Sequence, residues 1–169
     1  SAKLGDHIEM CAVQLPGRQN RIQEQPWTHV ADVVDEMTHD ISVFTEKPFA
    51  IFGHSIGALI SFELAWQLQT SHGVTPTQLF VSASAAPQFK GERPATHDLS
   101  DREFERKLKK YKGTPPELFQ NQEMKQLLFP MIRADFEMAY NYQFSPDRKL
   151  DCPVTALGGI RDRIRKKYL

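Results

Sequence analysis

The pentapeptide Gly53-His54-Ser55-Ile56-Gly57 is the stretch whose residue types and spacing best suit catalysis. A serine hydroxyl becomes a useful nucleophile on a strained turn between a strand and a helix, where its oxygen is exposed and backbone N–H groups can stabilise an oxyanion. Glycines on both sides suit such a turn, because a Cβ atom would be crowded there. The pentapeptide therefore predicts covalent catalysis through Ser55. The alternative is a glycine-bounded turn around a buried serine.

The flanks of the pentapeptide decide between these readings, because Gly-x-Ser-x-Gly arises by chance in roughly 5% of chains of this length. Residues 49–52 form an apolar run, which is typical of a strand buried on both faces of a parallel sheet. Apolar side chains then recur at helical spacing: Ile56, Leu59, Ile60, Leu64 and Leu68. This spacing predicts a helix over residues 56–69 with one apolar face, ending near Gly73.

Strand and helix patterns alternate along much of the chain. Strands are expected at residues 8–15, 49–53, 78–84 and 153–157. Helical patterns between them include residues 30–44 and 56–69. Such alternation predicts an α/β fold with a mostly parallel sheet. We expect one domain over residues 1–169.

The alternation breaks between Ser84 and Pro153, where the sequence instead predicts several amphipathic helices. Residues 100–103 form a capping box, and the apolar stripe of the helix that follows comprises Phe104, Leu108 and Tyr111. Further helices are expected to start at Pro115-Pro116-Glu117 and to cover residues 121–128 and 131–142. An excursion of this length is too long for a connector and is commonly a functional lid. We therefore expect a helical lid at about residues 90–145.

The composition excludes several function classes. The chain has 21 basic and 21 acidic side chains, and this zero net charge argues against a nucleic-acid partner. No apolar run reaches membrane-spanning length, and the first residues lack the apolar core of a secretory signal. Cys11 and Cys152 both lie in apolar, strand-like runs and are expected to be reduced core thiols of a cytoplasmic protein, with a disulfide as the alternative. No metal or cofactor is expected.

A serine nucleophile of this kind needs an acid and a histidine. In an α/β-hydrolase the serine comes first in the sequence, the acid second and the histidine last. Asp162 lies five residues beyond Leu157, where the last predicted strand ends; an exposed loop aspartate is the alternative. All six histidines precede Asp162, so the triad is incomplete in this chain. His54 is expected to point away from the serine, which leaves His97, at the mouth of the predicted lid, as the other candidate to test.

The sequence resembles the type II thioesterases. These are stand-alone α/β-hydrolases that serve nonribosomal peptide and polyketide synthases in antibiotic biosynthesis, and they have relatives that release medium-chain fatty acids. The resemblance extends through nearly the whole chain, and its order and spacing make it strong. It is carried by residues 11–18 (CAVQLPGR), 52–58 (FGHSIGA), 62–65 (FELA), 82–87, 112–117 (KGTPPE), 132–137 (IRADFE) and 157–159 (LGG).

The resemblance implies a role for each matching site residue. Ser55 would be the acyl-accepting nucleophile, Asp162 the triad acid, and the Ile56 backbone N–H one oxyanion donor. The substrate would be an acyl or aminoacyl thioester on the phosphopantetheine arm of an acyl or peptidyl carrier protein. Hydrolysis would clear stalled or misprimed carriers. A thioester suits this site because its thiolate leaves without a strong general acid.

The sequence also departs from the family pattern at both ends. Relatives begin with a further strand and a glycine loop that supplies the second oxyanion N–H, and they continue past the acid to a Gly-Gly-His segment. These departures predict a chain truncated at both ends, without its general base, that is weak or inactive in this form. Two alternatives stay open: a non-catalytic remnant that binds carrier proteins, and another serine esterase or acyltransferase that uses the same turn.

Overall fold

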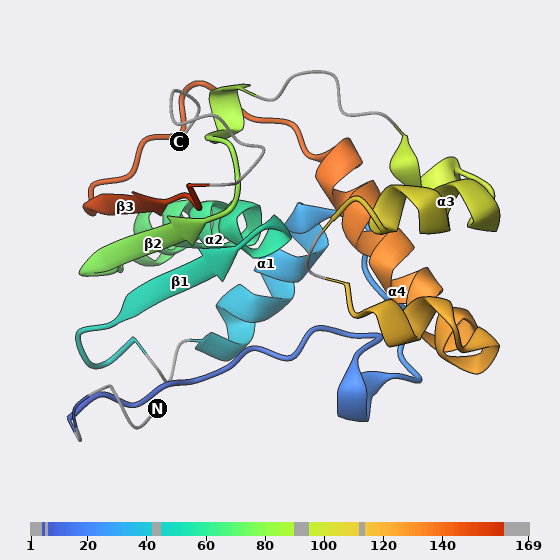
Figure 1. The fold of residues 1–169 in the computed structure, drawn as a ribbon. Helices are drawn as coiled ribbons and strands as arrows, with labels where there is room; N and C mark the ends of the chain where they lie inside the picture. The colour runs from blue at the N-terminus through green and yellow to red at the C-terminus, as the bar shows by residue number, and fades with distance from the viewer. Residues whose placement is uncertain (1–4, 6, 42–44, 90–94, 112–113, 161–169) are drawn as a thin grey trace.

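The described part of the chain contains a three-stranded parallel sheet, at the left in Figure 1. The computed structural model describes residues 5, 7–41, 45–89, 95–111 and 114–160. The strands are β1 (Ala50–His54), β2 (Gln78–Ser82) and β3 (Val154–Leu157), hydrogen-bonded in the order β1-β2-β3. Ile51 pairs with Leu79, and Leu79 with Val154. The predicted α/β fold with a parallel sheet is confirmed.

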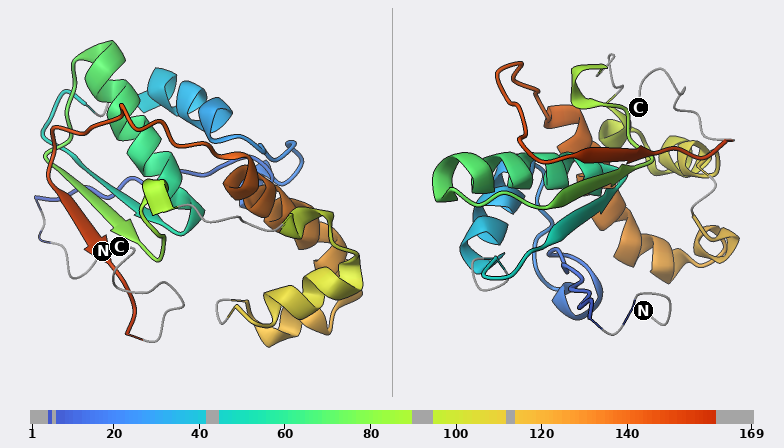
Figure 2. Two further views of the ribbon diagram at one scale, coloured as in Figure 1. Left: turned by 90° about the horizontal axis from the view of Figure 1, so that it is seen from above. Right: turned by 90° about the vertical axis from the view of Figure 1, so that its left-hand side faces the viewer.

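Two helices cover the same face of this sheet, as the left view of Figure 2 shows. They are α1 (Val30–Asp40) and α2 (Ile56–His72). The apolar spacing that predicted α2 corresponds to its buried face: Leu59, Ile60, Leu64 and Leu68 are each 5% exposed or less. The helix ends where Gly73 adopts a positive φ of 66°, a left-handed conformation that glycine accepts without steric cost. The predicted end of the helix is thereby confirmed.

The strand β1 is buried on one face only within the described residues. Ile51 packs against the core beneath α1 and α2, whereas the next residue, Phe52, is 64% exposed. Successive side chains of a strand point to opposite faces, so one layer of helices can bury only every second residue. The expectation of a strand buried on both faces is therefore wrong for the described part of the chain.

The strand predicted at residues 8–15 does not form. These residues make no ladder with another described strand, and Met10 and Val13 are 64% and 60% exposed. Strand-like alternation becomes a strand only where a neighbour accepts its hydrogen bonds. Cys11 is accordingly exposed rather than part of the core. Cys152 is buried as predicted, and this burial raises the pKa of its thiol.

The helical stretch between β2 and β3 contains α3 (Asp101–Leu108), α4 (Gln122–Asn141) and the short 3-10 helices η3 (Pro87–Phe89), η4 (Thr96–Asp98) and η5 (Pro116–Phe119). We call residues 95–142 the helical insertion. The capping box predicted for α3 is present, because the Glu103 carboxylate accepts the Ser100 backbone N–H at 3.3 Å. Of the predicted apolar stripe, Phe104 and Leu108 are buried, whereas Tyr111 is 40% exposed.

Helix α4 is one helix, where the sequence predicted two. It begins at its Asn121 cap, whose side chain accepts the Met124 N–H at 3.1 Å, and it continues through Pro130. Proline removes one backbone hydrogen bond and usually breaks a helix. Here Phe129, Ala134 and Met138 are buried on both sides of the proline, and this packing holds the helix together. None of the helices in the described part of the chain is both long and apolar enough to cross a membrane.

Candidate active site

Ser55 lies between the last residue of β1 and the first residue of α2, in a strained backbone conformation. Its φ is 56° and its ψ is −118°, which a residue with a Cβ atom adopts only at a cost. Two hydrogen bonds hold the turn: the Ser55 N–H donates to the Ser82 carbonyl at 2.8 Å, and the Ser55 carbonyl accepts the Ala58 N–H at 3.1 Å. The side chain is exposed. This is the geometry expected of a nucleophile elbow.

The two glycines of the pentapeptide differ in how much they are needed. A Cβ atom on Gly53 would lie 2.2 Å from the Gly57 carbonyl oxygen and 2.4 Å from the Ser61 Oγ. A Cβ atom on Gly57 would meet nothing within 4 Å outside its own helix. The expectation that both glycines relieve crowding is therefore correct for Gly53 and wrong for Gly57. The close approach is that of β1 to the first turn of α2.

Ile56 is the first residue of α2. The first N–H groups of a helix have no acceptor within the helix and carry its positive dipole end. They are therefore suited to stabilise an oxyanion formed at Ser55, and the assignment of the Ile56 N–H as an oxyanion donor stays a prediction.

The carboxyl ends of the three strands meet at one edge, and Ser55 lies on it. Next to it, Ala83 follows β2 with a φ of 52° and donates its N–H to the Leu157 carbonyl at 3.1 Å. In Figure 1 the strand arrowheads point toward the side where α3 and α4 lie. Ligands of parallel α/β sheets bind at this carboxyl edge. The strained Ala83 carried no signal in the sequence that could have identified it.

The predicted partners of Ser55 are not brought together with it in the described residues. Asp162 lies outside them. His54 is exposed, and its Nδ1 is 3.2 Å from the Ser82 Oγ. His97 is largely buried in η4, with its ring centre 5.0 Å from that of Tyr140. Its Nδ1 has no hydrogen-bond partner among the described residues. The Ser55 hydroxyl makes no hydrogen bond within the described part of the chain.

A long-range ion pair joins the loop before α1 to the helical insertion. Arg18 donates to the carboxylate of Asp135 on α4, and also to the Pro16 carbonyl at 3.2 Å. Burial raises the pKa of the Asp135 carboxyl, and Arg18 counteracts part of that rise. The sequence had identified both residues as parts of separate family motifs, but it held no signal that they pair across 117 positions.

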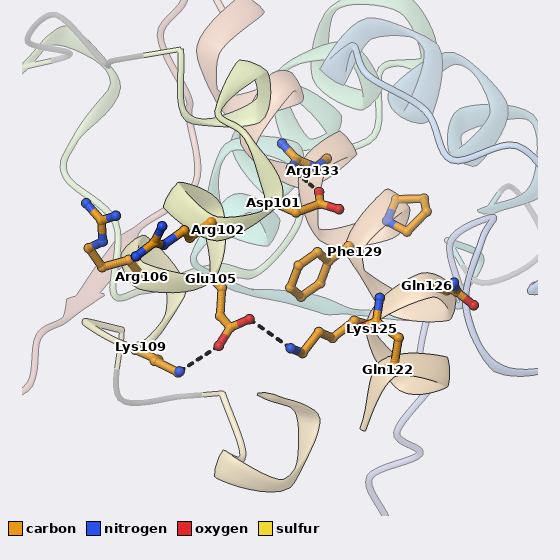
Figure 3. Close-up of a pocket in the computed structure, with 11 residues that line it drawn as sticks. Asp101, Arg102, Glu105, Arg106, Lys109, Gln122, Lys125, Gln126, Phe129 and Arg133 are labelled. Carbon is orange, nitrogen blue, oxygen red and sulfur yellow. Dashed lines mark hydrogen bonds and ion pairs between the residues drawn. The ribbon is translucent and has the colours of Figure 1, made fainter. Parts of the chain in front are cut away.

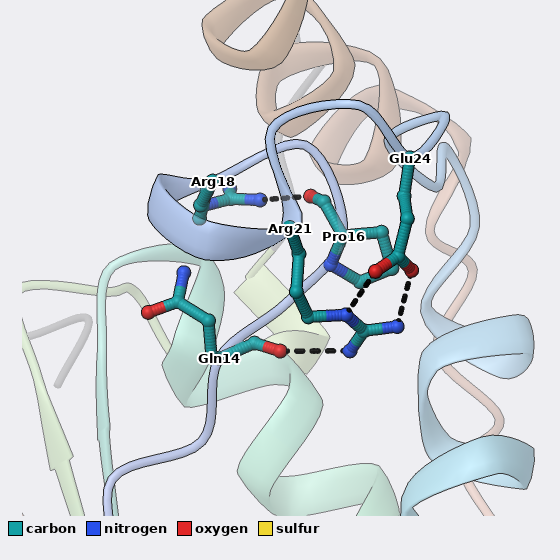
Figure 4. A network of polar contacts seen from close by, with 5 residues as sticks. All are labelled: Gln14, Pro16, Arg18, Arg21 and Glu24. Atoms are coloured by element: carbon teal, nitrogen blue, oxygen red, sulfur yellow. Dashed lines mark hydrogen bonds and ion pairs between the residues drawn. The ribbon is translucent and has the colours of Figure 1, made fainter.

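The loop that carries Arg18 is braced by its own contacts (Figure 4). Arg21 donates to the Gln14 carbonyl at 2.9 Å and forms an ion pair with Glu24. Gly17 has a φ of 77°, and its N–H donates to the Arg21 carbonyl at 2.9 Å. Pro16 and Gly17 thus form a turn. It presents Arg18 to α4.

A second set of polar contacts connects α2 to the end of the helical insertion. Glu63 on α2 is 5% exposed, and its carboxylate accepts the Tyr142 hydroxyl at 2.6 Å and a guanidinium N–H of Arg148. Arg148 also lies over the Trp66 ring, 4.6 Å from its centre. A buried carboxylate needs such partners. These contacts therefore link α2 to the end of α4 and to the loop before β3.

The parallel sheet, the strained serine at its carboxyl edge and the helical insertion together define a protein of the α/β-hydrolase type. The family model for the thioesterase domain matches residues 1–167, and the chain belongs to that family. The gramicidin S biosynthesis protein GrsT of Aneurinibacillus migulanus is 43% identical over 155 residues, which cover 92% of this chain and 60% of that protein.

A second relative and a solved structure agree with this assignment. Linear gramicidin dehydrogenase LgrE of Brevibacillus parabrevis is 42% identical over 163 residues, which cover 95% of this chain and 62% of that protein. The type II thioesterase BorB from the borrelidin biosynthetic cluster superimposes with a TM-score of 0.82 and 35% identity, over 93% of this chain and 64% of that one. This chain thus spans less than two thirds of the length of these relatives. The resemblance to type II thioesterases is confirmed.

Proposed function

We propose that this chain carries the nucleophile of a type II thioesterase, which hydrolyses acyl or aminoacyl thioesters on the phosphopantetheine arm of a carrier protein. The observation that carries the proposal is the strained, exposed Ser55 at the carboxyl edge of the sheet, with φ 56° and ψ −118°, in a chain of the thioesterase family. Strain of this kind persists only where surrounding structure maintains it, and it clusters at active sites.

The proposed chemistry divides hydrolysis into two steps. The Ser55 oxygen attacks the thioester carbonyl, the carbon–sulfur bond breaks, and the serine proton leaves with the carrier thiol. Water then attacks the serine ester, releases the free acid and restores the serine hydroxyl. The Ile56 N–H stabilises the oxyanion of both steps, and Asp162 acts as the triad acid. A cytoplasmic location, where carrier proteins are loaded, stays a prediction.

A second candidate function is carrier binding without hydrolysis. It is favoured by the observation that, in the described part of the chain, no histidine is hydrogen-bonded to Ser55. A general base contributes about a hundred- to ten-thousandfold to such a reaction. The two candidates therefore differ in measured turnover but not in the carrier they recognise.

Labelling by a fluorophosphonate and thiol release test the proposal. The chain is expected to react with the probe at Ser55 and, because no general base is expected in it, to release thiol only slowly from acyl-carrier and acyl-coenzyme A thioesters. Ser55→Ala should remove both the labelling and this slow release of thiol. Ser71→Ala, which removes an exposed serine at the far end of α2, is the matched control and should leave both unchanged.

Three results would contradict this proposal. A chain that binds the carrier but neither labels nor turns over would support the non-catalytic candidate. Faster cleavage of oxygen esters than of matched thioesters would indicate a different esterase. Equal loss of labelling in Ser55→Ala and Ser71→Ala would show that the probe does not report the elbow.

A further inference from the structure

A groove of about 620 Å³ lies between α3 and α4, in the helical insertion (Figure 3). One face of each helix forms its walls. None of its lining residues belongs to the elbow, so it is separate from the site built around Ser55. Its size is within the range of ordinary ligand and partner sites.

The lining of the groove is strongly basic. It contains five cationic and two acidic side chains, in a chain whose net charge is zero. Both carboxylates are paired inside the groove: Asp101 accepts from Arg133 at 2.7 Å, and Glu105 accepts from Lys109 at 2.6 Å and from Lys125 at 2.9 Å. These contacts hold the pKa of the Glu105 carboxyl below its usual range. The other two cationic side chains that line the groove form no ion pair with these two carboxylates.

Those remaining cations are Arg102 and Arg106. They lie one turn apart on α3, both are exposed, and neither makes an ion pair or hydrogen bond within the described residues. Two like charges at this spacing are unfavourable for the free helix. In Figure 3 both guanidinium groups lie on the α3 side of the groove. They form a positive rim, which the nearby Glu103 carboxylate offsets in part at Arg106.

Phe129 and Pro130 are the apolar residues that line the groove, and Phe129 is held from beneath by packing that is already in place. The Phe129 ring packs edge-on against Phe104, with ring centres 5.3 Å apart, and the Arg133 guanidinium lies 4.2 Å over the Phe104 ring. The ion pairs Asp101–Arg133 and Glu105–Lys125 join α3 to α4 on two sides of Phe129 (Figure 3). A partner therefore meets walls that are already in place, which lowers the entropic cost of binding.

We propose that this groove docks an acidic amphipathic helix on the surface of the carrier protein; the proposal rests on the function proposed above. Its cations are spread along the walls, since Arg102 and Lys109 are about 10 Å apart along the axis of α3, and Lys125 and Arg133 about 12 Å along α4. An acidic helix can meet such rows with its carboxylates, and its apolar face can contact Pro130 and the exposed edge of Phe129.

A single phosphate group fits this arrangement less well. The Glu105 carboxylate lies between Lys109 and Lys125 and would repel an anion placed among them. The groove also belongs to the side of the molecule toward which the strand carboxyl ends point (Figure 1). A carrier held there stays on the same side as Ser55.

Charge reversal at the rim tests the docking. The pair Arg102→Glu and Arg106→Glu should weaken binding of a holo carrier domain by about tenfold or more, with a weaker dependence on salt. The matched control is Lys47→Glu with Lys149→Glu, two exposed lysines outside the groove, which makes the same change in net charge and should alter affinity by less than about twofold. Arg102→Gln with Arg106→Gln is the second variant, in case the reversed pair fails to fold by circular dichroism.

Other results would overturn the docking. Equal losses in the rim and control variants would mean that total charge alone sets affinity. Coenzyme A or inorganic phosphate that binds the parent chain and is lost in the rim variant, with carrier binding intact, would identify a phosphate site instead. A parent chain that binds no carrier also refutes the docking. The proposed function is then decided separately, by fluorophosphonate labelling of Ser55, which involves no carrier.

Discussion

The described part of the molecule contains two apolar cores that are built in different ways. The sheet core lies between the strands, α1 and α2, and joins residues far apart in the sequence, such as Val33, Leu64 and Tyr142. The insertion core gathers Phe104, Leu118 and Phe129 with other residues from one continuous stretch. Helix α4 belongs to both, because its first half packs into the insertion core and its last turns into the sheet core.

This difference separates two tasks. The sheet core holds the backbone of Ser55 in a conformation that costs free energy, and long-range packing from several elements maintains it. The insertion core is made of local contacts, and it attaches to the rest through α4 and through ion pairs such as Arg18–Asp135. Ser55 is thus placed by the globally assembled part of the molecule, and the groove by the locally assembled part.

The largest expected effect comes from removing one large side chain from each core. Phe129→Ala should cost about 3–5 kcal/mol, and Leu64→Ala about 2–5 kcal/mol, in the free energy of unfolding. Because the cores are distinct, hydrogen exchange should accelerate mainly over α3 and α4 in the first variant, and mainly over β1, β2 and α2 in the second. Similar acceleration of all elements in both variants would show that the two cores unfold as one unit.

Removing the buried carboxylate of α2 should be almost as costly. Glu63→Ala leaves Arg148 and the Tyr142 hydroxyl without their partner and should lower the free energy of unfolding by about 3–5 kcal/mol. Glu105→Ala, which breaks the more exposed ion pairs of the insertion, is the matched control and should cost about 1 kcal/mol or less. Urea unfolding followed by circular dichroism measures both. Equal costs would contradict the idea that burial sets the difference.

The two elbow glycines provide a smaller and more local test. Gly53→Ala should destabilise the chain by about 1–3 kcal/mol, because its Cβ would overlap the Gly57 carbonyl and the Ser61 hydroxyl. Gly57→Ala has open space and should stabilise α2 by up to about 1 kcal/mol, since alanine favours helices. Melting temperatures of the two variants should move in opposite directions. A shift of the same sign in both variants would refute the conclusion that β1 approaches α2 closely at Gly53 and not at Gly57.

The smallest effect is in the pH dependence of stability. The pKa of Asp135 is raised in the folded protein. The stability that this shift contributes is therefore complete when the pH is below the ordinary pKa of 3.8, and it is lost as the pH rises through the higher pKa of the folded state. The pKa of Glu105 is lowered in the folded protein. The stability that this shift contributes is therefore present when the pH is above the ordinary pKa of 4.5, and it is lost as the pH falls through the lower pKa of the folded state.

Unfolding free energies between pH 3 and pH 7 measure these contributions in Asp135→Asn and Glu105→Gln. Relative to the parent, Asp135→Asn should become more stable as the pH rises, and Glu105→Gln less stable, each by about 1 kcal/mol or less. Slopes of the same sign would show that the two carboxylates do not occupy opposite environments.

Much of the fold could be predicted because its signals are local. The spacing of Leu59, Ile60, Leu64 and Leu68 defined α2, and Gly73 its end, since helical hydrogen bonds join residues four apart. The elbow was recognisable because strand, turn and helix are contiguous around Ser55. The strand predicted at residues 8–15 failed because a strand needs a partner elsewhere, which no local pattern supplies.

The sequence by itself determined the parallel α/β plan, the serine elbow and the thioesterase family. Tertiary structure alone decided that Arg18 meets Asp135, that Glu63 meets Arg148, and that α4 continues through Pro130. It also decided which elbow glycine is crowded and where the cations of α3 and α4 face one groove. The physical reason is that backbone periodicity repeats within a few residues, whereas burial and ion pairing depend on which distant segments the fold places side by side.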